Sequence, residues 1–281
     1  MNTTATATAG PGLGTRPAGP EGAVHPAAAG PPRRIPLPRI VAVELRKSFD
    51  TRAGFWLLAS IGIGALLATG LVIAFAPEAQ LTYATFTLAI GYPMSVILPI
   101  IAVLSVTAEW TQRSGLTTFT LVPHRGRVVF AKGIGMLLVA VAAMVVAFPL
   151  GALGNVVGAA VHGTPTVWDQ DPSDVLYFAL ANALLTMVGF MLGVLIRASA
   201  GAIVAYFVYG FVAPTLLTFL AMSQEWFRDA QPWVDPNYSQ DALFRGGFGA
   251  EQWAQLGLTS VVWLILPLVV GVVSLLRSEV K

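Results

Sequence analysis

The chain contains no cysteine and few charged residues, and both deficits narrow the functions open to it. Without cysteine it has no disulfide framework, no cysteine-ligated zinc or iron–sulfur cluster and no thiol nucleophile. Charged residues make up only 11% of its 281 residues, whereas an ordinary globular domain carries about 25%. Hydrophobic residues make up 56%. This composition indicates a membrane protein.

Motifs for catalysis are also missing. The histidines are His25, His124 and His162, and neither an HExxH zinc motif nor a Gly-x-Ser-x-Gly nucleophile turn occurs. The sequence has no Gly-x-x-x-x-Gly-Lys-[Ser/Thr] phosphate loop. We therefore expect no catalytic residue, no metal site and no enzyme activity in this chain, and any ATP that drives it must be hydrolysed by another chain.

Six long stretches without Asp, Glu, Lys or Arg predict the membrane spans, because a helix needs about 20 apolar residues to cross about 30 Å of hydrocarbon. The third stretch has 36 residues, and its last part, from His162 to Pro165, reads as a loop. We therefore expect one span with an outer extension there. The predicted spans are about 54–76, 84–108, 133–161, 175–196, 199–222 and 254–276.

The basic residues predict the orientation, since cytoplasmic loops hold an excess of Lys and Arg. Of the 16 basic residues, all but Arg228 and Arg245 fall in the N-terminal segment, the 109–132 loop, the 197 turn or the C-terminal tail. Both termini are therefore expected in the cytoplasm. The frequent Ala, Gly, Pro and Arg favour a GC-rich bacterial genome, and hence a multi-pass protein of the bacterial plasma membrane.

The residues before the first span fall into two parts. Residues 1–36 are rich in Ala, Pro and Gly and are expected to form a disordered, low-complexity cytoplasmic tail. From Leu37 to Asp50, apolar residues recur at helical spacing, with charged residues such as Glu44 on the other face. This pattern predicts a helix lying in the membrane interface. A simple charged anchor before the first span is the alternative.

The source of energy for any transport is not visible in the spans. Proton-driven carriers usually keep an ionisable residue inside the bundle, and the six charge-free stretches hold no Asp, Glu, Lys or Arg. Backbone carbonyls and hydroxyls at a broken helix can hold sodium, so an ion-coupled carrier remains an alternative. Six spans without an internal energy source favour a driving partner.

The loop between the second and third predicted spans has charged ends and a charge-free centre from Ser114 to His124. Gly115 and Pro123 interrupt this centre, which predicts a helix, a sharp turn and a second helix that re-enters the membrane. An alternative is that Glu109, Arg113, Arg125, Arg127 and Lys132 merely flank the membrane helices and set topology by charge, with Arg127 and Lys132 as anchors to lipid headgroups.

At these residues the sequence resembles the membrane subunit of ABC-2 type ATP-binding-cassette transporters. That family has an acidic residue after the second span, a Gly/Thr-rich stretch, a proline, and then Arg and Ala-Lys opening the third span. The matching residues are Glu109, Gly115, Thr117, Thr118, Pro123, Arg125 or Arg127, and Ala131-Lys132. Glu44-Leu45-Arg46-Lys47 also looks like the family's entry into its first span. The resemblance covers residues 39 to 281.

The resemblance implies an all-α polytopic membrane protein with six transmembrane helices, an ABC-2 (type V exporter-like) permease fold in residues 37–281 and an amino-terminal interfacial elbow helix. It implies cytoplasmic ABC ATPase subunits, which bind ATP and magnesium, and a second permease subunit, with no nucleic acid as partner. The loop would be a coupling helix that docks on the ATPase. Its implied contact residues are Glu109, Arg113, Gly115, Thr117, Thr118, Phe119, Pro123 and Arg125.

Prolines and tyrosines inside the second and fifth predicted spans suggest a substrate path. Proline bends a helix and frees a backbone carbonyl, which is tolerated where neighbours or a cavity satisfy it. In the resembled family these two spans line the central path. The candidate residues are Tyr92, Pro93, Pro99, Tyr206, Tyr209 and Pro214. Aromatic residues that simply pack in a bundle are the alternative.

Two further patterns bear on architecture and function. The segment between Ser223 and Glu251 combines six aromatic residues with acidic ones, which suggests short helices dipping back into the outer leaflet. Small-residue pairs at 154/158 and 189/193 favour close helix packing within one subunit. The sequence thus predicts a permease subunit that exports a hydrophobic or amphipathic compound. An ion-coupled carrier or channel of unrelated fold, and a non-transporting membrane anchor or sensor, are the alternatives.

Overall fold

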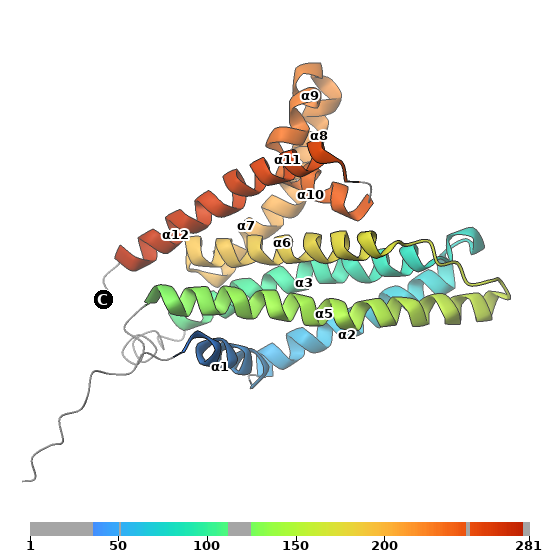
Figure 1. Ribbon diagram of the computed structural model, residues 1–281, viewed down its shortest axis with the longest axis horizontal. Coiled ribbons are helices and arrows are strands. Elements are labelled where there is room, and N and C mark those ends of the chain that lie inside the picture. The colour runs from blue at the N-terminus through green and yellow to red at the C-terminus, as the bar shows by residue number, and fades with distance from the viewer. Residues whose placement is uncertain (1–35, 51, 112–124, 246–247, 278–281) are drawn as a thin grey trace, which may run out of the picture. The chain divides into compact units, whose positions relative to one another are not determined.

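The computed structural model describes residues 36–50, 52–111, 125–245 and 248–277, which belong to one compact unit. These residues are nearly all helical (Figure 1). The helices are α1 (Leu37–Asp50), α2 (Arg52–Phe75), α3 (Tyr83–Thr111), α5 (Arg125–His162), α6 (Pro172–Ile196), α7 (Ser199–Phe207), α8 (Ala213–Ser223), α9 (Glu225–Val234), α10 (Pro236–Arg245), α11 (Ala250–Ser260) and α12 (Leu266–Arg277). A short 3-10 turn, η1 (Glu78–Gln80), follows α2, and two π-helical segments, η2 (Val208–Val212) and η3 (Val261–Ile265), join α7 to α8 and α11 to α12.

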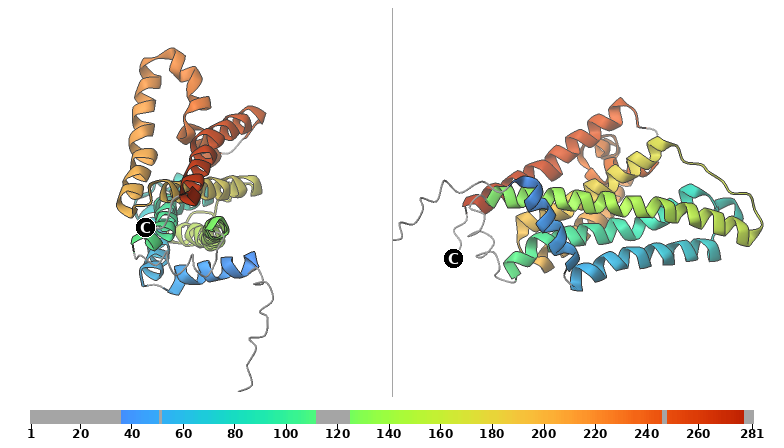
Figure 2. Two further views of the ribbon diagram at one scale, coloured as in Figure 1. Left: turned by 90° about the vertical axis from the view of Figure 1, so that its left-hand side faces the viewer. Right: turned by 60° about the horizontal axis from the view of Figure 1, so that its bottom comes forward.

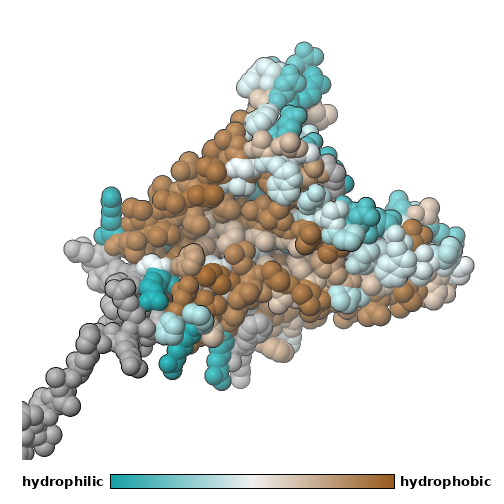
Figure 3. Space-filling view, in the orientation of Figure 1, coloured by the Kyte–Doolittle hydropathy of each residue, from teal (hydrophilic) through white to brown (hydrophobic). Residues whose placement is uncertain are grey.

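The described chain has six helical stretches that are long and apolar enough to cross a membrane, as the sequence predicted. They are Gly54–Phe75, Tyr83–Ala108, Gly126–His162, Pro172–Ile196, Ser199–Ser223 and Ala250–Arg277. Apolar side chains cover their flanks, while hydrophilic side chains gather near α9 and at the ends of the bundle (Figure 3). The exposed apolar flanks suit a hydrocarbon environment.

Helix α5 differs from the expected division into a membrane span and an outer extension. It continues as one helix of 38 residues through Pro149 and ends at His162, before Gly163, which has a positive φ of 69°. Two glycines in the second half of α5 allow close packing against α3. A Cβ on Gly154 would lie 2.7 Å from Phe86, and a Cβ on Gly158 would lie 2.9 Å from the same ring. Packing against α3 therefore outweighs the weak helix propensity of glycine.

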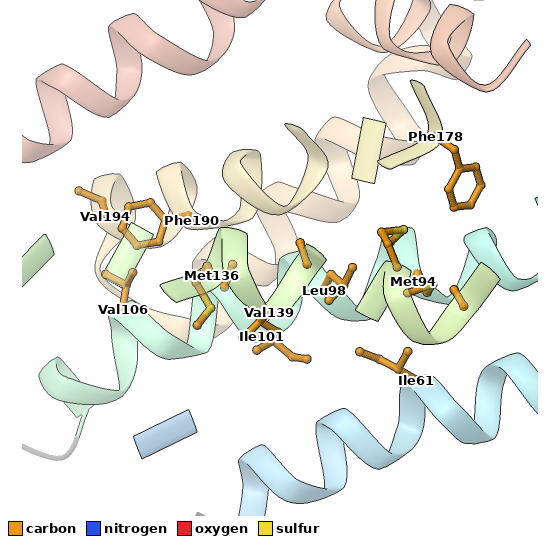
Figure 4. Packing of buried hydrophobic residues seen from close by; sticks show 14 of the residues in the cluster. Ile61, Met94, Leu98, Ile101, Val106, Met136, Val139, Phe178, Phe190 and Val194 are labelled. Carbon is orange, nitrogen blue, oxygen red and sulfur yellow. The ribbon is translucent and has the colours of Figure 1, made fainter. Parts of the chain in front are cut away.

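Helix α3 is the central element of the bundle and packs against α2, α5, α6 and α7. One row of its side chains, spaced four residues apart, is fully or almost fully buried: Phe86, Ile90, Met94, Leu98, Ala102 and Val106. Figure 4 shows Met94, Leu98 and Val106 of this row among side chains from the neighbouring helices. A helix surrounded on several sides needs apolar residues around more than one face, which explains its nearly uniform hydrophobicity.

Helix α6 approaches α3 through two small residues. A Cβ on Gly189 would lie 2.4 Å from the carbonyl oxygen of Pro99, and a Cβ on Gly193 would lie 3.2 Å from the carbonyl oxygen of Val103. These contacts are with backbone atoms of the same chain. The expectation that the small-residue pairs serve packing within one subunit is therefore confirmed.

The loop between α5 and α6 is fastened to the start of α3. The backbone N–H of Tyr83 donates to the carbonyl of Val167 (3.0 Å), and the N–H of Ala84 donates to Asp169 Oδ1 (2.9 Å). Asn155 of α5 also donates to the Val167 carbonyl (2.9 Å). These bonds satisfy N–H groups in the first turn of α3, which have no partner inside the helix, and hold this end of the bundle together.

Helix α1 runs crosswise to α2 and α5 near the end of the bundle where α5 begins (Figure 2). Ile40 and Val41 are buried against Ala131 of α5. Beside this cluster, Lys132 Nζ donates to Glu44 Oε2 at 2.5 Å and to the carbonyl of Ser105 in α3 at 3.2 Å. Both side chains are only 6–7% exposed. This pair joins three helices.

The interpretation of Lys132 as a lipid-headgroup anchor is therefore wrong, and Glu44 is not on a solvated face of α1. The sequence pattern could not show that these two charges, far apart in the chain, meet in a buried position. A charge taken out of water is tolerated only when paired and hydrogen-bonded, and the Glu44 and Lys132 side chains satisfy that condition for each other.

We predict that Gly189→Ala destabilises the protein by about 1–3 kcal/mol, because the added methyl group meets backbone that cannot rotate away. Gly62→Ala in α2 is the control, since a Cβ there has no neighbour within 4 Å. Reversible unfolding in mixed micelles measures both variants. Equal effects of the two substitutions would contradict the close approach of α6 to α3.

Breaking the buried pair on one side only should be more harmful than removing it entirely. Lys132→Met leaves a buried carboxylate without its cation, at a cost of about 3–5 kcal/mol. The double variant Glu44→Leu/Lys132→Met removes both charges and should recover most of that loss. The same unfolding measurement tests this, and a double variant less stable than Lys132→Met would refute the pairing.

Candidate functional site

A cavity of about 370 Å³ lies between α3, the η2–α8 segment and the α9–α10 segment. Its wall combines aromatic and apolar side chains with several polar groups. The lining residues are Leu88, Gly91, Tyr92, Ser95, Leu185, Tyr206, Gly210, Phe211, Pro214, Thr218, Gln231, Asp235, Asn237, Tyr238, Gln240, Asp241 and Phe244. A concave site of this size with a few polar groups is typical of a small-molecule site.

Proline in α3 determines one wall of the cavity. Pro99 has no N–H, so the carbonyl of Ser95, four residues earlier, lacks its helical partner. Tyr206 of α7 supplies the missing donor, with its Oη 2.5 Å from that carbonyl oxygen. The Tyr206 ring is buried in a cluster with Val188 and Met191. The second and fifth spans are thus joined by a hydrogen bond that the proline makes available.

The π-helical segment η2 forms a second wall and is bonded to α10. Asn237 Nδ2 donates to the backbone carbonyl of Tyr209 (3.0 Å), and Gln240 Nε2 donates to Tyr209 Oη (3.2 Å). On its other side α10 is held by Ser239, whose hydroxyl lies 2.7 Å from that of Thr259 in α11. Widened helical turns of this kind occur often at functional sites.

Asp235 immediately precedes α10 and lines the cavity, and the residue is only 1% exposed. Its Oδ1 accepts from the backbone N–H groups of Asn237 (3.0 Å) and Tyr238 (3.3 Å), and its Oδ2 accepts from Gln231 Nε2 (3.0 Å). Asp followed by Pro at the first helical position is a strong start signal for a helix. Local sequence therefore explains why α10 begins here, and the carboxylate is held in place by three donors.

The cavity brings together three of the predicted path residues, Tyr92, Tyr206 and Pro214. Tyr209 lies next to it and connects η2 to α10. Pro93 instead lies against Gly64 of α2.

Pro99 packs with its backbone on Gly189 of α6. It acts on the cavity only through the carbonyl of Ser95, which its missing N–H leaves for Tyr206.

The polar groups from the α9–α10 segment were not among the predicted site residues. They are Gln231, Asp235, Asn237, Gln240 and Asp241. Short helices were expected between Ser223 and Glu251, and α9 and α10 are present there. The Asp235-Pro236 start signal could have located α10, but no sequence pattern shows which of its faces meets α3.

Most residues of the predicted coupling loop lie outside the described part of the chain: Arg113, Gly115, Thr117, Thr118, Phe119 and Pro123. Glu109 belongs to the last turn of α3, and Arg125 is the first residue of α5. Within the described ranges no group of three His, Cys, Asp or Glu is placed to hold a metal. The polar groups of the cavity are suited to binding a ligand.

We predict that Tyr206→Phe destabilises the protein by about 1 kcal/mol, because the Ser95 carbonyl then lacks a partner. Pro99→Ala restores an N–H four residues beyond Ser95. In the Pro99→Ala background the loss of the Tyr206 hydroxyl should therefore cost much less. Unfolding of the two single variants and the double variant measures this coupling. Strictly additive effects would contradict the proposed role of Pro99.

Neither the models of known protein families nor the curated proteins match this chain. Its function has to follow from its own residues and their geometry.

Proposed function

We propose that this chain is the membrane-spanning subunit of an ABC-2 type transporter, which exports a hydrophobic or amphipathic compound. Separate cytoplasmic subunits would hydrolyse the ATP. The observation that supports this most is the attachment of α1. An amphipathic helix precedes the first span and is held by the Glu44–Lys132 pair against α3 and α5, the two helices that the 112–124 loop connects.

This attachment suits a subunit that receives force from a cytoplasmic partner. The loop would act as the coupling element and α1 as the elbow helix. A push on the loop would reach the ends of α3 and α5 together with α1, because Lys132 bonds to Glu44 of α1 and to Ser105 of α3. Coupling between subunits requires an element that makes different contacts in two states. In this proposal the three joined helix ends shift together when the ATPase changes state.

The distribution of charge supports a cytoplasmic location for this end. The starts of α2, α5 and α7 and the end of α12 lie at the same end of the bundle (Figure 1). The basic residues of these elements and of α1 include Arg39, Arg127, Lys132 and Arg277, and Arg197 lies in the turn just before α7. Under the positive-inside rule this end faces the cytoplasm, as the proposal for a bacterial plasma membrane requires.

The second permease subunit is proposed to pack against the fifth span. Large apolar residues along Ser199–Ser223 are exposed, including Val204, Leu216 and Phe219. Such a surface requires lipid or another membrane helix against it. The cavity beside this span contributes a place for cargo within the path.

Copurification tests the proposal. We expect the full chain, isolated from its own host after mild crosslinking, to bring down a protein with a phosphate-loop ATPase motif. Replacing Thr117, Thr118 and Phe119 with Gly-Ser-Gly should lower the recovery of that ATPase several-fold while membrane levels of the chain stay unchanged, because the flanking charges that set topology remain.

The matched control replaces Thr164, Pro165 and Thr166, in the loop at the other end of α5, with the same three residues. This variant should recover the ATPase normally. If no ATPase copurifies, and the isolated chain transports in liposomes without ATP, the chain is an ion-coupled carrier or channel. If no ATPase copurifies and no transport occurs, an anchor or sensor is favoured.

A further inference from the structure

The cavity beside α3 has an acidic wall with an uncompensated charge. Asp235 is buried, and among the described residues no Lys, Arg or His forms an ion pair with it. Asp241 differs, because its carboxylate is exposed and lies 2.8 Å from Arg245 Nη2. No basic side chain is among the residues that line the cavity. The cavity therefore presents one buried negative charge without a cation.

The three donors on Asp235 do not exhaust its capacity. They are a side-chain amide and two backbone N–H groups, all neutral. A carboxylate has about four acceptor positions on its two oxygens, so one position remains for a further donor. Neutral donors also compensate a buried charge less than a cation does, which leaves a positively charged ligand favoured at this point.

A second group on the same helix points to the same ligand chemistry. Gln240 is 3% exposed and lines the cavity. Its amide nitrogen donates to Tyr209 Oη, while its Oε1 has no hydrogen-bond partner. An unpaired buried acceptor is costly and rare. A ligand with N–H donors would satisfy both Gln240 Oε1 and the Asp235 carboxylate.

The remaining lining determines the body of the ligand. Tyr92, Phe211 and Phe244 line the cavity with aromatic rings, as does Tyr238, whose ring centroid already lies 5.8 Å from Arg245 Cζ. Aromatic faces attract cations and pack well against apolar or aromatic groups. A small multiply charged ion would leave most of this surface without a partner, whereas an amphipathic molecule would fill it.

We propose that this cavity binds an amphipathic organic cation, with a protonated amine at Asp235 and Gln240 and an apolar body against the aromatic rings. The proposal rests on the transport function proposed above in so far as the ligand is the cargo. It sharpens the cargo expected from sequence, because the charge-free spans gave no reason to expect a positive charge. The acidic group comes from α10, outside those spans.

Direct binding to the full chain tests this without any ATPase. The chain is placed in nanodiscs of zwitterionic phosphatidylcholine, so that anionic lipid does not attract the probe. Equilibrium dialysis compares naphthylethylamine, which is a cation at neutral pH, with naphthylethanol, which has nearly the same shape and no charge. Empty nanodiscs supply the background. We expect the amine to bind at least about tenfold more tightly, which corresponds to about 1.4 kcal/mol.

The variant Asp235→Asn should remove this preference. Asparagine serves as well as aspartate at a helix start, and its amide can still bond to Gln231, so α10 should stay in place. Asp229→Asn is the matched control, because Asp229 is an exposed acid on α9 that does not line the cavity. Amine binding should weaken about tenfold in the first variant and less than twofold in the second, with alcohol binding unchanged in both.

Three outcomes would overturn the proposal. Equal binding of amine and alcohol would mean that the aromatic surface alone attracts the probe. Equal loss of amine binding in the Asp229 and Asp235 variants would mean that the probe responds to the overall negative charge of this region and not to a specific site at Asp235. No binding of either probe to protein that remains folded by its unfolding transition would exclude the cavity. None of these results bears on ATPase copurification, so the transport proposal is tested separately.

Discussion

The need to satisfy every backbone carbonyl inside hydrocarbon shapes the centre of this protein. Pro99 removes one N–H from the central helix α3, and the carbonyl of Ser95 must find another donor. Tyr206 provides it across the gap between the second and fifth spans. That bond fixes α7 against α3, and the η2–α8 segment that follows α7 forms the other wall of the cavity.

Small residues decide how closely the other helices approach α3. Gly189 and Gly193 bring the backbone of α6 against Pro99 and Val103, and Gly154 and Gly158 receive the ring of Phe86. The hydrophobic effect does not drive helices together inside hydrocarbon. Close van der Waals contacts and a few hydrogen bonds between helices hold the bundle together instead. The same tight packing leaves α3 one open face, toward α8 and α10, where the polar groups of the cavity are found.

Charges in this chain are few, and the buried ones among the described residues, Glu44, Lys132 and Asp235, have different partners. Glu44 is compensated by Lys132 within the bundle, so this pair fastens α1 to α5. Asp235 is compensated only by neutral donors, so it still favours a cation. Glu44 and Asp235 are both buried, so burial alone does not distinguish them. The charge of the partner does: a cation for Glu44, and only neutral donors for Asp235. This difference also gives the proposed transporter a reason to prefer charged amphipathic cargo.

The sequence by itself determined the six apolar helices, the amphipathic helix before them and the distribution of basic residues, because each follows from the composition and periodicity of one continuous segment. It also indicated Tyr92, Tyr206 and Pro214, since proline and tyrosine inside a span are conspicuous. Only the tertiary structure decided that Lys132 meets Glu44, that Tyr206 bonds to the carbonyl of Ser95, and that Asp235 and Gln240 line a cavity with α3. Those contacts join residues far apart in the chain, and their energies depend on burial and on the partner that each polar atom finds, which no local pattern contains.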